Sequence, residues 1–297
     1  MKALIIGAAG FVGGYLAEHL QKEYGWSVSV TKLEHETFFI EEAAVYDLDI
    51  LDEKAVQQLL FQIEPDYIFH LAAQSSVALS WKNPDLTIDV NIKGCIHVLE
   101  AVRKLKKQPR ILLVGSGEEY GIQNIYAATK ACQNMLGTIY AKAYQMEIVL
   151  VRAFNHIGPK QSSVFVVSDF CRQAAEIEAG KREPVLWVGN LEIKRDFTDV
   201  RDIVRAYGML IQKGKAGENY NVGSGRAVAI QEILEKILSL SKKKIRIETD
   251  PKKLRPLDLP VIEADIQKLQ EVTGWKPQIS LEDTIRDILE DWREKQR

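Results

Sequence analysis

The sequence has few cysteines, no long apolar run and almost no net charge, and each absence excludes a class of protein. Cys95, Cys132 and Cys171 are an odd number without the close pairing of a zinc or redox site, which suits a reducing compartment. No apolar stretch is long enough to cross a bilayer, and the N-terminus has no signal-peptide pattern. The formal net charge is -2 and the basic residues are dispersed. We therefore expect a cytoplasmic protein that binds no metal, nucleic acid or membrane.

The sequence does contain alternating strand and helix patterns. Its 297 residues, 46% of them hydrophobic, are enough to bury a full core. Short apolar runs predict buried strands at residues 3–6, 27–30, 67–71, 111–114 and 148–151. Helical periodicity predicts crossover helices at residues 11–24, 53–63, 84–104 and 126–144. This order predicts an α/β fold with a Rossmann-type doubly wound parallel sheet.

The pattern loosens from about Gly158 onward. Loops interrupt helices predicted at residues 164–179 and 230–240, and a last helix begins after Ser280. We predict a Rossmann domain at residues 1–157 and a smaller C-terminal lobe at residues 158–297, partly interleaved with the first.

Three glycines follow the first predicted strand, at the point where a helix begins. In the run Gly7, Gly10, Phe11, Val12 and Gly13, the glycines let backbone N–H groups approach a pyrophosphate at the helix N-terminus. The alternative is a turn that only packs strand against helix. The βα repeats that follow favour a nicotinamide dinucleotide site, and the GxxGxxG spacing resembles the short-chain dehydrogenase/reductase superfamily.

The second predicted strand ends near Thr31 and Lys32, where an acidic side chain selects NAD in many dinucleotide folds. A cation at this point favours NADP(H) over NAD(H), although Glu34 is close and Lys32 is equally compatible with a solvated surface lysine. After the third strand, Asp49 and Ile50 resemble the superfamily's adenine-flanking pair.

A tyrosine and a lysine stand four residues apart in the helix after the strand at 111–114. The spacing of Tyr126 and Lys130 places both on one helical face, and a lysine there would lower the pKa of the phenol. The phenol would then exchange a proton with a carbinol or carbonyl oxygen. Ser116, at the end of the preceding strand, would bond the same oxygen. Alternatively, the pair is an ordinary helix surface and Ser116 a turn residue.

Two further motifs, HLAAQSSV at residues 70–77 and FNHIGP at residues 154–159, extend the likeness. Together with the preceding motifs they resemble the extended short-chain dehydrogenase/reductases that act on nucleotide sugars, over nearly the whole chain. The resemblance implies a catalytic set of Ser116, Tyr126 and Lys130. It also implies cofactor contacts by Leu71, Ala72 and Ala73, together with Tyr126 and Lys130. It further implies that Asn155 reaches the sugar-nucleotide diphosphate and that the C-terminal lobe binds the nucleotide sugar. His70 and His156 are interpreted as structural.

One departure concerns the segment between Ser116 and Tyr126. Only ten positions separate them, whereas the family usually has about two dozen residues there, forming a flap beside the sugar. Ten residues span up to roughly 33 Å, so the two hydroxyls can still converge. Either the flap is short or residues are missing from this sequence.

Two charged loops resemble the GDP-sugar branch of the family. The run at residues 189–200, interpreted as an exposed loop, offers Asn190, Lys194 and Arg195, and an arginine fork matches diphosphate oxygens. Further on, Arg255 and Asp258 match a second diphosphate arginine and a ribose-binding acid. The alternative for both loops is a solvated charged turn. We expect a GDP-sugar substrate.

Within this branch the choice lies between a reductase and a dehydratase. Glu118 keeps an acid that dehydratases use, but Ser116 replaces their threonine. The loop at residues 154–159 and the compact length favour NAD(P)H-dependent reduction of the 4-keto group of a GDP-4-keto-6-deoxyhexose, giving GDP-D-rhamnose or a stereoisomer. The alternatives are a GDP-mannose 4,6-dehydratase, another nucleotide-sugar epimerase or dehydratase, and a non-enzymatic cofactor-binding regulator.

The helices predicted at 84–104 and 126–144 carry apolar residues, namely Ile92, Ile96, Leu99, Met135, Leu136 and Ile139. The family pairs the equivalent helices across a two-fold axis, so a homodimer through a helix bundle is expected. The same residues would also serve the core of a monomer.

Overall fold

The structure is a computed structural model that describes residues 1–254 and 257–297. The chain divides into two compact units, each assembled from three segments. Unit 1 consists of Met1–Ala153, Val204–Val222 and Ile266–Trp275. Unit 2 consists of Phe154–Ile203, Gly223–Asp265 and Lys276–Arg297.

Unit 1 is built on a seven-stranded sheet whose neighbouring strands are all parallel. In spatial order the strands are β10 (Asn219–Val222), β6 (Ile148–Ala153), β5 (Arg110–Ser116), β4 (Tyr67–His70), β1 (Lys2–Ile6), β2 (Ser27–Lys32) and β3 (Ala44–Asp47). The order reverses between β1 and β4, and ligands of such sheets bind at this switch point, beside the carboxyl ends of the strands. The predicted α/β fold with a doubly wound parallel sheet is confirmed.

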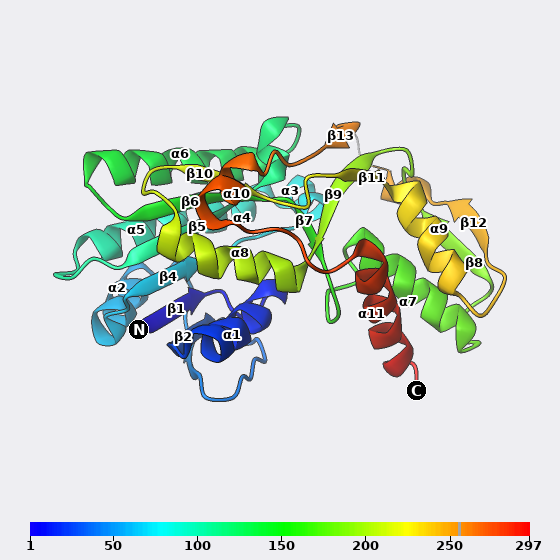
Figure 1. Cartoon of the computed structure of the whole chain (residues 1–297), viewed down its shortest axis with the longest axis horizontal. Coiled ribbons are helices and arrows are strands. Elements are labelled where there is room, and N and C mark those ends of the chain that lie inside the picture. The colour runs from blue at the N-terminus through cyan, green and yellow to red at the C-terminus, as the bar shows by residue number, and fades with distance from the viewer. Residues whose placement is uncertain (255–256) are drawn as a thin grey trace. The chain divides into compact units, whose positions relative to one another are not determined.

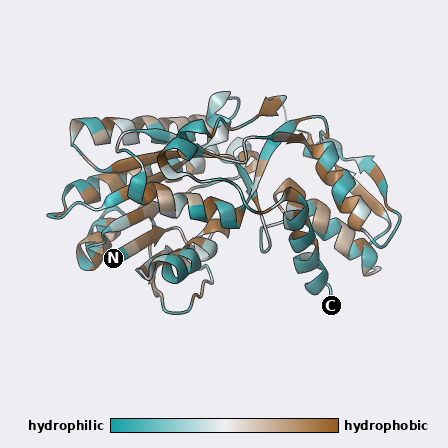
Figure 2. Cartoon of the chain, viewed as in Figure 1, coloured by the Kyte–Doolittle hydropathy of each residue, from teal (hydrophilic) through white to brown (hydrophobic). Residues whose placement is uncertain are grey.

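Helices cover both faces of this sheet (Figure 1). They are α1 (Phe11–Tyr24), α2 (Glu53–Ile63), α3 (Val77–Lys82), α4 (Pro84–Ile88), α5 (Cys95–Arg103), α6 (Ile125–Ala143), α8 (Val200–Lys213, from Val204 onward) and α10 (Gln267–Thr273). One core contains buried residues of α2 and α5 packed on alternate strand residues such as Leu4, Ile68 and Leu113. Figure 2 shows hydrophobic residues concentrated on the central strands. Period-two burial of this kind fixes which side chains reach each face.

The predicted helix at residues 84–104 is interrupted. It consists of α4, a π-helical turn (Asp89–Gly94) and α5. The wider turn contains Asn91, which is fully buried and bonded outside its own helix, and such bulges are common at functional sites. Apolar periodicity carries no signal for one inserted residue, so the sequence predicted a continuous helix.

Unit 2 combines small sheets with three longer helices. A four-stranded sheet contains β11 (Ala227–Ala229), β9 (Lys194–Asp199), β13 (Val261–Ile262) and β7 (Asn155–Ile157), while β12 (Arg246–Thr249) pairs with β8 (Val185–Val188). The helices are α7 (Val166–Glu178), α9 (Ile230–Leu240) and α11 (Leu281–Glu294). Their apolar faces share one core, which includes Phe170, Ile233 and Ile288. The predicted helix at 164–179 begins two residues later than expected, after the extended residue Phe165.

Within residues 1–254 and 257–297, no helix is long and apolar enough to cross a membrane. The same described residues contain no group of three or more His, Cys, Asp or Glu side chains arranged to hold a metal ion.

Candidate active site

The glycine turn of unit 1 joins β1 to α1. Gly7 has a left-handed φ of 83°, and a Cβ there would lie 2.5 Å from the Ala72 Cα. A Cβ on Gly13 would collide with the backbone of Ala8, whereas one on Gly10 would meet only the Gly7 carbonyl oxygen, at 3.6 Å. Gly7 and Gly13 are therefore needed for packing. Gly10 instead keeps an open approach to the N-terminus of α1, which no side chain caps, and this fits a dinucleotide pyrophosphate.

Thr31 fixes the position of this turn. The Gly7 amide donates to the Thr31 hydroxyl at 3.0 Å, and the Ala8 amide donates to the Thr31 carbonyl at 2.7 Å. Thr31, which lies where many dinucleotide folds select their cofactor, thus holds the turn against β2. Sequence offered no signal for this role, because it depends on the alignment of two parallel strands.

Lys32 lies at the end of β2 and is mostly buried. Its ammonium donates to Asp47 at 2.5 Å and to the carbonyls of Leu33 and Glu34 at 3.2 and 3.3 Å. It is therefore not the freely solvated lysine of the alternative interpretation. That Lys32 favours NADP by binding its 2′-phosphate stays a prediction. Asp47 would compete with that phosphate for the Lys32 ammonium.

The other predicted cofactor residues line the same edge of the sheet. The amides of Leu71 and Ala72 both donate to the Ile6 carbonyl, at 3.0 and 2.8 Å, so the 71–73 loop that includes Ala73 starts beside the glycine turn. Asp49 is exposed, and its carboxylate accepts from a neighbouring amide. Ile50 is buried in the core under Gly94, which lacks a side chain at the point of contact.

Ser116, Tyr126 and Lys130 are brought together at the carboxyl end of β5. Ser116 is the last residue of that strand, and Tyr126 and Lys130 lie one turn apart near the start of α6. The Ser116 hydroxyl lies close enough to Tyr126 to lower the pKa of the phenol. The Lys130 ammonium donates to the Val114 carbonyl at 2.5 Å and to Gln133 at 2.8 Å. Ser116 and Tyr126 are thus close enough to bond one reacting oxygen, while the Lys130 ammonium bonds Val114 and Gln133.

Burial dominates the pKa values of this group. Burial raises the pKa of Tyr126 to about 12, opposed by its hydrogen bond with Ser116 and assisted by the charges of Glu118 and Glu119. Burial also lowers the pKa of Lys130 to about 8. The prediction that Lys130 lowers the Tyr126 pKa stays a prediction, because in this structure the ammonium bonds Val114 and Gln133 and burial sets the pKa of the phenol.

The short segment between Ser116 and Tyr126 forms a capped turn. A 3₁₀ helix (Gly117–Tyr120) follows β5, with Ser116 as its N-cap, and Asn124 caps α6 by accepting from Ala127 at 2.8 Å. Glu118 accepts from Asn124 at 3.3 Å and is partly buried. Ten positions are therefore enough to connect the two hydroxyls without strain from an unsatisfied helix end.

A buried polar set beneath the site was missed by sequence reasoning. Asn91, in the π-helical turn, accepts from the Gln74 amide at 2.8 Å and donates to the Gln74 carbonyl and to the Thr129 hydroxyl, at 3.1 and 3.0 Å. His70 is buried nearby, and burial together with the Lys130 charge lowers its pKa to about 3. A neutral His70 agrees with the expectation that it is not an acid-base group.

In unit 2, two predicted substrate residues bind each other. The buried Arg195 guanidinium donates to Asp258 and to the carbonyls of Lys194 and Leu259, each carbonyl at 2.8 Å. The expectation of an exposed loop at residues 189–200 is wrong from residue 194 onward, because β9 occupies that part and pairs with three strands. Arg255 lies outside the described residues. Diphosphate binding by Arg195 and ribose binding by Asp258 stay predictions.

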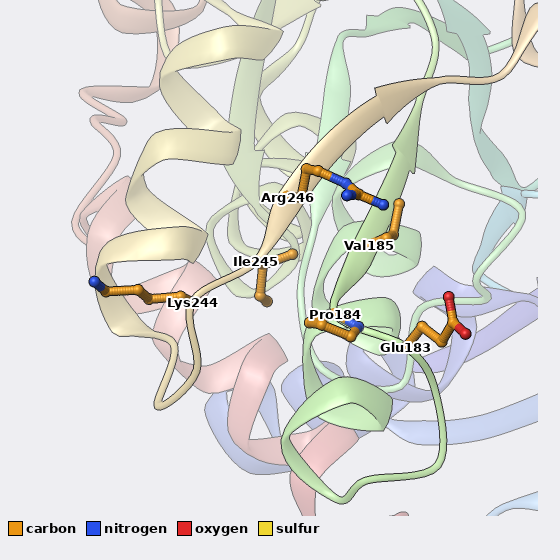
Figure 3. A pocket seen from close by; sticks show the side chains of 6 residues that line it. All are labelled: Glu183, Pro184, Val185, Lys244, Ile245 and Arg246. Carbon is orange, nitrogen blue, oxygen red and sulfur yellow. The ribbon is translucent and has the colours of Figure 1, made fainter.

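The remaining predicted substrate residues of unit 2 are exposed. Asn155 lies in β7, Lys194 begins β9, and Asn190 accepts from the Glu192 amide at 3.0 Å. A shallow hollow of about 500 Å³ in this unit is lined by Glu183, Pro184, Val185, Lys244, Ile245 and Arg246 (Figure 3). None of the predicted substrate residues lines this hollow.

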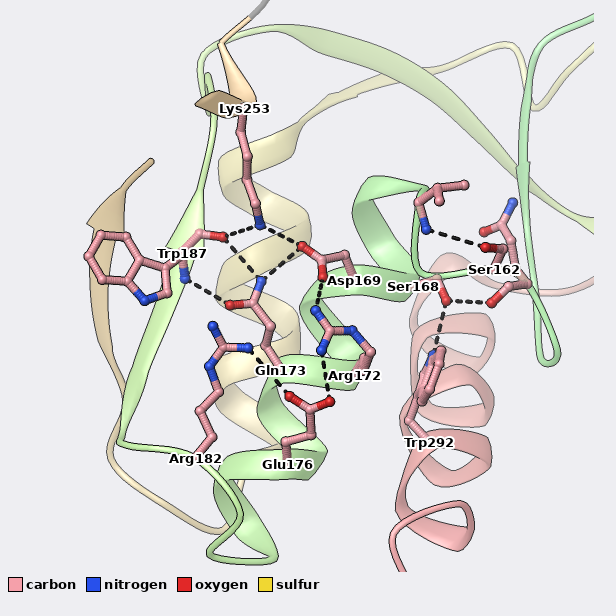
Figure 4. A network of polar contacts seen from close by, with 12 residues as sticks. Ser162, Ser168, Asp169, Arg172, Gln173, Glu176, Arg182, Trp187, Lys253 and Trp292 are labelled. Carbon is pink, nitrogen blue, oxygen red and sulfur yellow. Dashed lines mark hydrogen bonds and ion pairs between the residues drawn. The ribbon is translucent and has the colours of Figure 1, made fainter. Parts of the chain in front are cut away.

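A polar network instead ties α7 to its neighbours within unit 2 (Figure 4). Asp169 accepts from Arg172 and Lys253, both at 2.6 Å, and from Gln173 at 2.9 Å. Gln173 and Lys253 also donate to the Trp187 carbonyl, at 3.1 and 2.8 Å. These charges hold strand and helix together, so they resemble structural ion pairs more than a ligand site.

Comparison with known proteins adds relatives along the full length. The chain is 28% identical to GDP-6-deoxy-D-mannose reductase of Pseudomonas aeruginosa, over 100% of this chain and 98% of that protein. It is 27% identical to GDP-mannose 4,6-dehydratase of Yersinia enterocolitica, over 97% of this chain and 92% of that protein.

Among solved structures, RMD from Pseudomonas aeruginosa complexed with NADPH superposes with a TM-score of 0.87, at 28% identity, over 99% of this chain and 100% of that one. UDP-glucose 4-epimerase of Thermus thermophilus in complex with NAD has a TM-score of 0.87 at 26% identity, over 99% of each chain. Relatives thus bind either nicotinamide dinucleotide.

A model of the GDP-mannose 4,6 dehydratase family matches residues 4–288. This match and the relatives confirm the predicted likeness to extended short-chain dehydrogenase/reductases of nucleotide-sugar metabolism. The chain belongs to the GDP-mannose 4,6 dehydratase family.

Proposed function

We propose that this protein reduces the 4-keto group of a GDP-4-keto-6-deoxyhexose with a nicotinamide dinucleotide, converting GDP-4-keto-6-deoxy-D-mannose to GDP-D-rhamnose. The observation that carries the proposal is the placement of Ser116 at the end of β5, close to Tyr126 and Lys130 at the start of α6, in the sheet that holds the glycine turn. The full-length reductase relative supports this substrate class.

The residues present fit such a cofactor. The N-terminus of α1 beside Gly10 would hold the pyrophosphate, and the 71–73 loop and Asp49 would lie along the rest of the dinucleotide. When bound, the nicotinamide supplies the hydride that forms the new C–H bond at sugar carbon 4. We favour NADPH, on account of Lys32.

The protein's own groups handle the proton and the developing charge. A phenol with a pKa of about 12 is protonated at neutral pH, so Tyr126 can give its proton to the oxygen at carbon 4. Ser116, whose hydroxyl lies close to the phenol, would donate a hydrogen bond to the same oxygen. Lys130, with a pKa of about 8, is mostly cationic at pH 7 and stabilises the phenolate that remains after the transfer.

The test is absorbance at the nicotinamide band with GDP-4-keto-6-deoxy-D-mannose and NADPH, with NADH in a parallel assay. Oxidation of the cofactor together with formation of a GDP-6-deoxyhexose supports the proposal. No oxidation with either cofactor overturns it. A non-enzymatic regulator would bind the cofactor in this assay without turnover.

A dehydratase is the second candidate, favoured by Glu118. This carboxylate follows Ser116 by two residues and lies close enough to raise the pKa of Tyr126. Elimination of water needs such an acid-base group in addition to the phenol. Loss of water from GDP-mannose, with no net change of cofactor, would select the dehydratase over the reductase.

We further propose a cytoplasmic homodimer. The free thiols of Cys95 and Cys171 are buried, which suits a reducing compartment. On α6, Met135 and Ile139 are 65% and 54% exposed, whereas Leu99 of α5 is fully buried in the core. Substitution of Ile139→Asp should convert a dimer to a monomer in sedimentation velocity, and an unchanged sedimentation coefficient would contradict this interface.

A further inference from the structure

Glu119 is a buried carboxylate beside the catalytic serine that the proposed chemistry does not use. One of its oxygens accepts from the Ser116 backbone amide at 2.7 Å. The Asn134 side chain donates to both oxygens at 2.8 and 2.9 Å, and the Arg152 Nε donates at 3.0 Å. We refer to Glu119, Asn134, Arg152 and the Ser116 amide as the Glu119 clamp. It joins the 3₁₀ turn, α6 and β6 within unit 1.

Gly115 leaves the space in which the clamp closes. A Cβ on this residue would overlap the Asn134 amide and the Glu119 carboxylate and would lie 2.8 Å from the Val151 carbonyl oxygen. The glycine before the catalytic serine is thus needed because two polar side chains meet over its backbone. Any larger residue would push the Glu119 carboxylate away from Asn134.

The clamp lies on the same face of α6 as the catalytic pair. Tyr126, Lys130 and Asn134 follow one another at four-residue intervals, so they form one stripe along the helix. Lys130 bonds the Val114 carbonyl, and Asn134 reaches the Ser116 amide through Glu119. The helix is therefore tied to the end of β5 at two points, one before Ser116 and one at Ser116 itself.

The charge of the clamp is balanced inside unit 1. Arg152 faces Glu119 from β6 and also lies over the Tyr120 ring, with 5.3 Å from its guanidinium carbon to the ring centroid. The carboxylate accepts from three different groups, so it is poorly suited to bind substrate or to transfer a proton. Removing one side chain of such a buried network leaves the groups that were bonded to it without a partner.

We propose that Glu119 is a positioning residue that sets the place of the Ser116 hydroxyl relative to Tyr126, with Asn134 and Arg152 holding it in place. The inference rests on the proposed reductase function, which gives Ser116 and Tyr126 their roles. A misplacement of about 1 Å at a reacting group can lower a rate about a hundredfold, so the clamp governs kcat more than binding.

Kinetics of Asn134→Leu, which keeps the side-chain volume and removes the donor, test the proposal. We expect kcat to fall about tenfold to a hundredfold, with the NADPH dissociation constant unchanged. In a Ser116→Ala background, the same substitution should change kcat by less than about twofold, since the hydroxyl it positions is absent. Thr138→Val is the matched control, because its hydroxyl bonds only within α6, and it should leave kcat unchanged.

A second measurement does not depend on substrate. Hydrogen-deuterium exchange of the peptide around Ser116 should be faster in Asn134→Leu than in the unmodified protein and in Thr138→Val, because the Ser116 amide loses its fixed acceptor. If Asn134→Leu fails to fold, Arg152→Met removes a partly exposed donor from the same carboxylate and takes its place in both assays.

The outcomes separate the two proposals. An inactive unmodified protein overturns the reductase function, and the exchange measurement then decides alone whether the clamp holds the Ser116 amide. An active protein whose Asn134→Leu variant keeps its kcat overturns the clamp, as does an equal loss of rate in the Ser116→Ala background. Unchanged exchange at Ser116 also overturns it.

Discussion

The polar groups of unit 1 and those of unit 2 are used differently. In unit 1, the side chains of Ser116 and Lys130 bond backbone groups and an uncharged amide. In unit 2, the charged side chains of Asp196 and Arg195 form hydrogen bonds with other residues of the same unit. A buried charge that is fully paired belongs to the fold, whereas a buried titratable group whose pKa is displaced by burial is a candidate for chemistry.

The substitution Tyr126→Phe tests whether the unit 1 residues carry the chemistry, and it should have the largest effect. We expect kcat to fall by about 10² to 10⁴, because the proton donor is lost while the ring that fills the site remains. NADPH binding, followed by fluorescence, should be preserved. An active Tyr126→Phe variant would mean that another group supplies the proton and would remove the basis of the catalytic assignment.

The corresponding substitution in unit 2 is Asp196→Ala. This fully buried carboxylate accepts from the Ser224 amide and hydroxyl at 2.7 and 2.6 Å, from the Gly225 amide at 2.9 Å and from the Ala264 amide at 3.2 Å. Its loss should lower the free energy of unfolding by about 3–5 kcal/mol, since these donors stay buried without an acceptor. Urea denaturation measures the effect, with Ser116→Ala as the unit 1 control.

A third prediction concerns the pH dependence of stability. The pKa of Lys130 is lowered from 10.5 to about 8, so below about pH 8 folding keeps a charge in a poorly solvated site. Between about pH 8 and 10.5 the unfolded state binds more protons than the folded state, so this penalty is relieved as the pH rises.

The free energy of unfolding should therefore rise through that window by up to about 3 kcal/mol from Lys130 alone. This rise should be absent in Lys130→Met, so the difference between the two pH profiles gives the contribution of Lys130. Chemical denaturation at pH 7.5, 9 and 10 measures it. Equal slopes in both proteins would show that Lys130 is not desolvated in solution.

The smallest expected effect concerns cofactor choice. Lys32→Ala should reduce the ratio of kcat/KM for NADPH over NADH several-fold, while Asp47→Asn, which releases the ammonium from its partner, should increase that ratio. The two variants should change the ratio in opposite directions. A Lys32→Ala variant with an unchanged ratio would place the selectivity in other residues.

The sequence determined much of unit 1 through local rules. Helices α1 and α2 have the predicted bounds, as does α9 in unit 2, and the order of strands and crossover helices in unit 1 followed from apolar periodicity. The glycine turn and the four-residue spacing of Tyr126 and Lys130 were also readable, because both depend on neighbours within one turn of chain.

Only the tertiary structure decided which partners the charged and polar side chains bind. Asp258 lies 63 residues from Arg195, and Asn134 reaches Glu119 across 15 residues, so no local pattern reveals either pairing. The pKa of Tyr126 likewise depends mainly on burial, which raises it above its usual value, and spacing along the helix carries no information on burial. Local sequence sets which side chains share a face, but solvation and long-range partners fix what a titratable group can do.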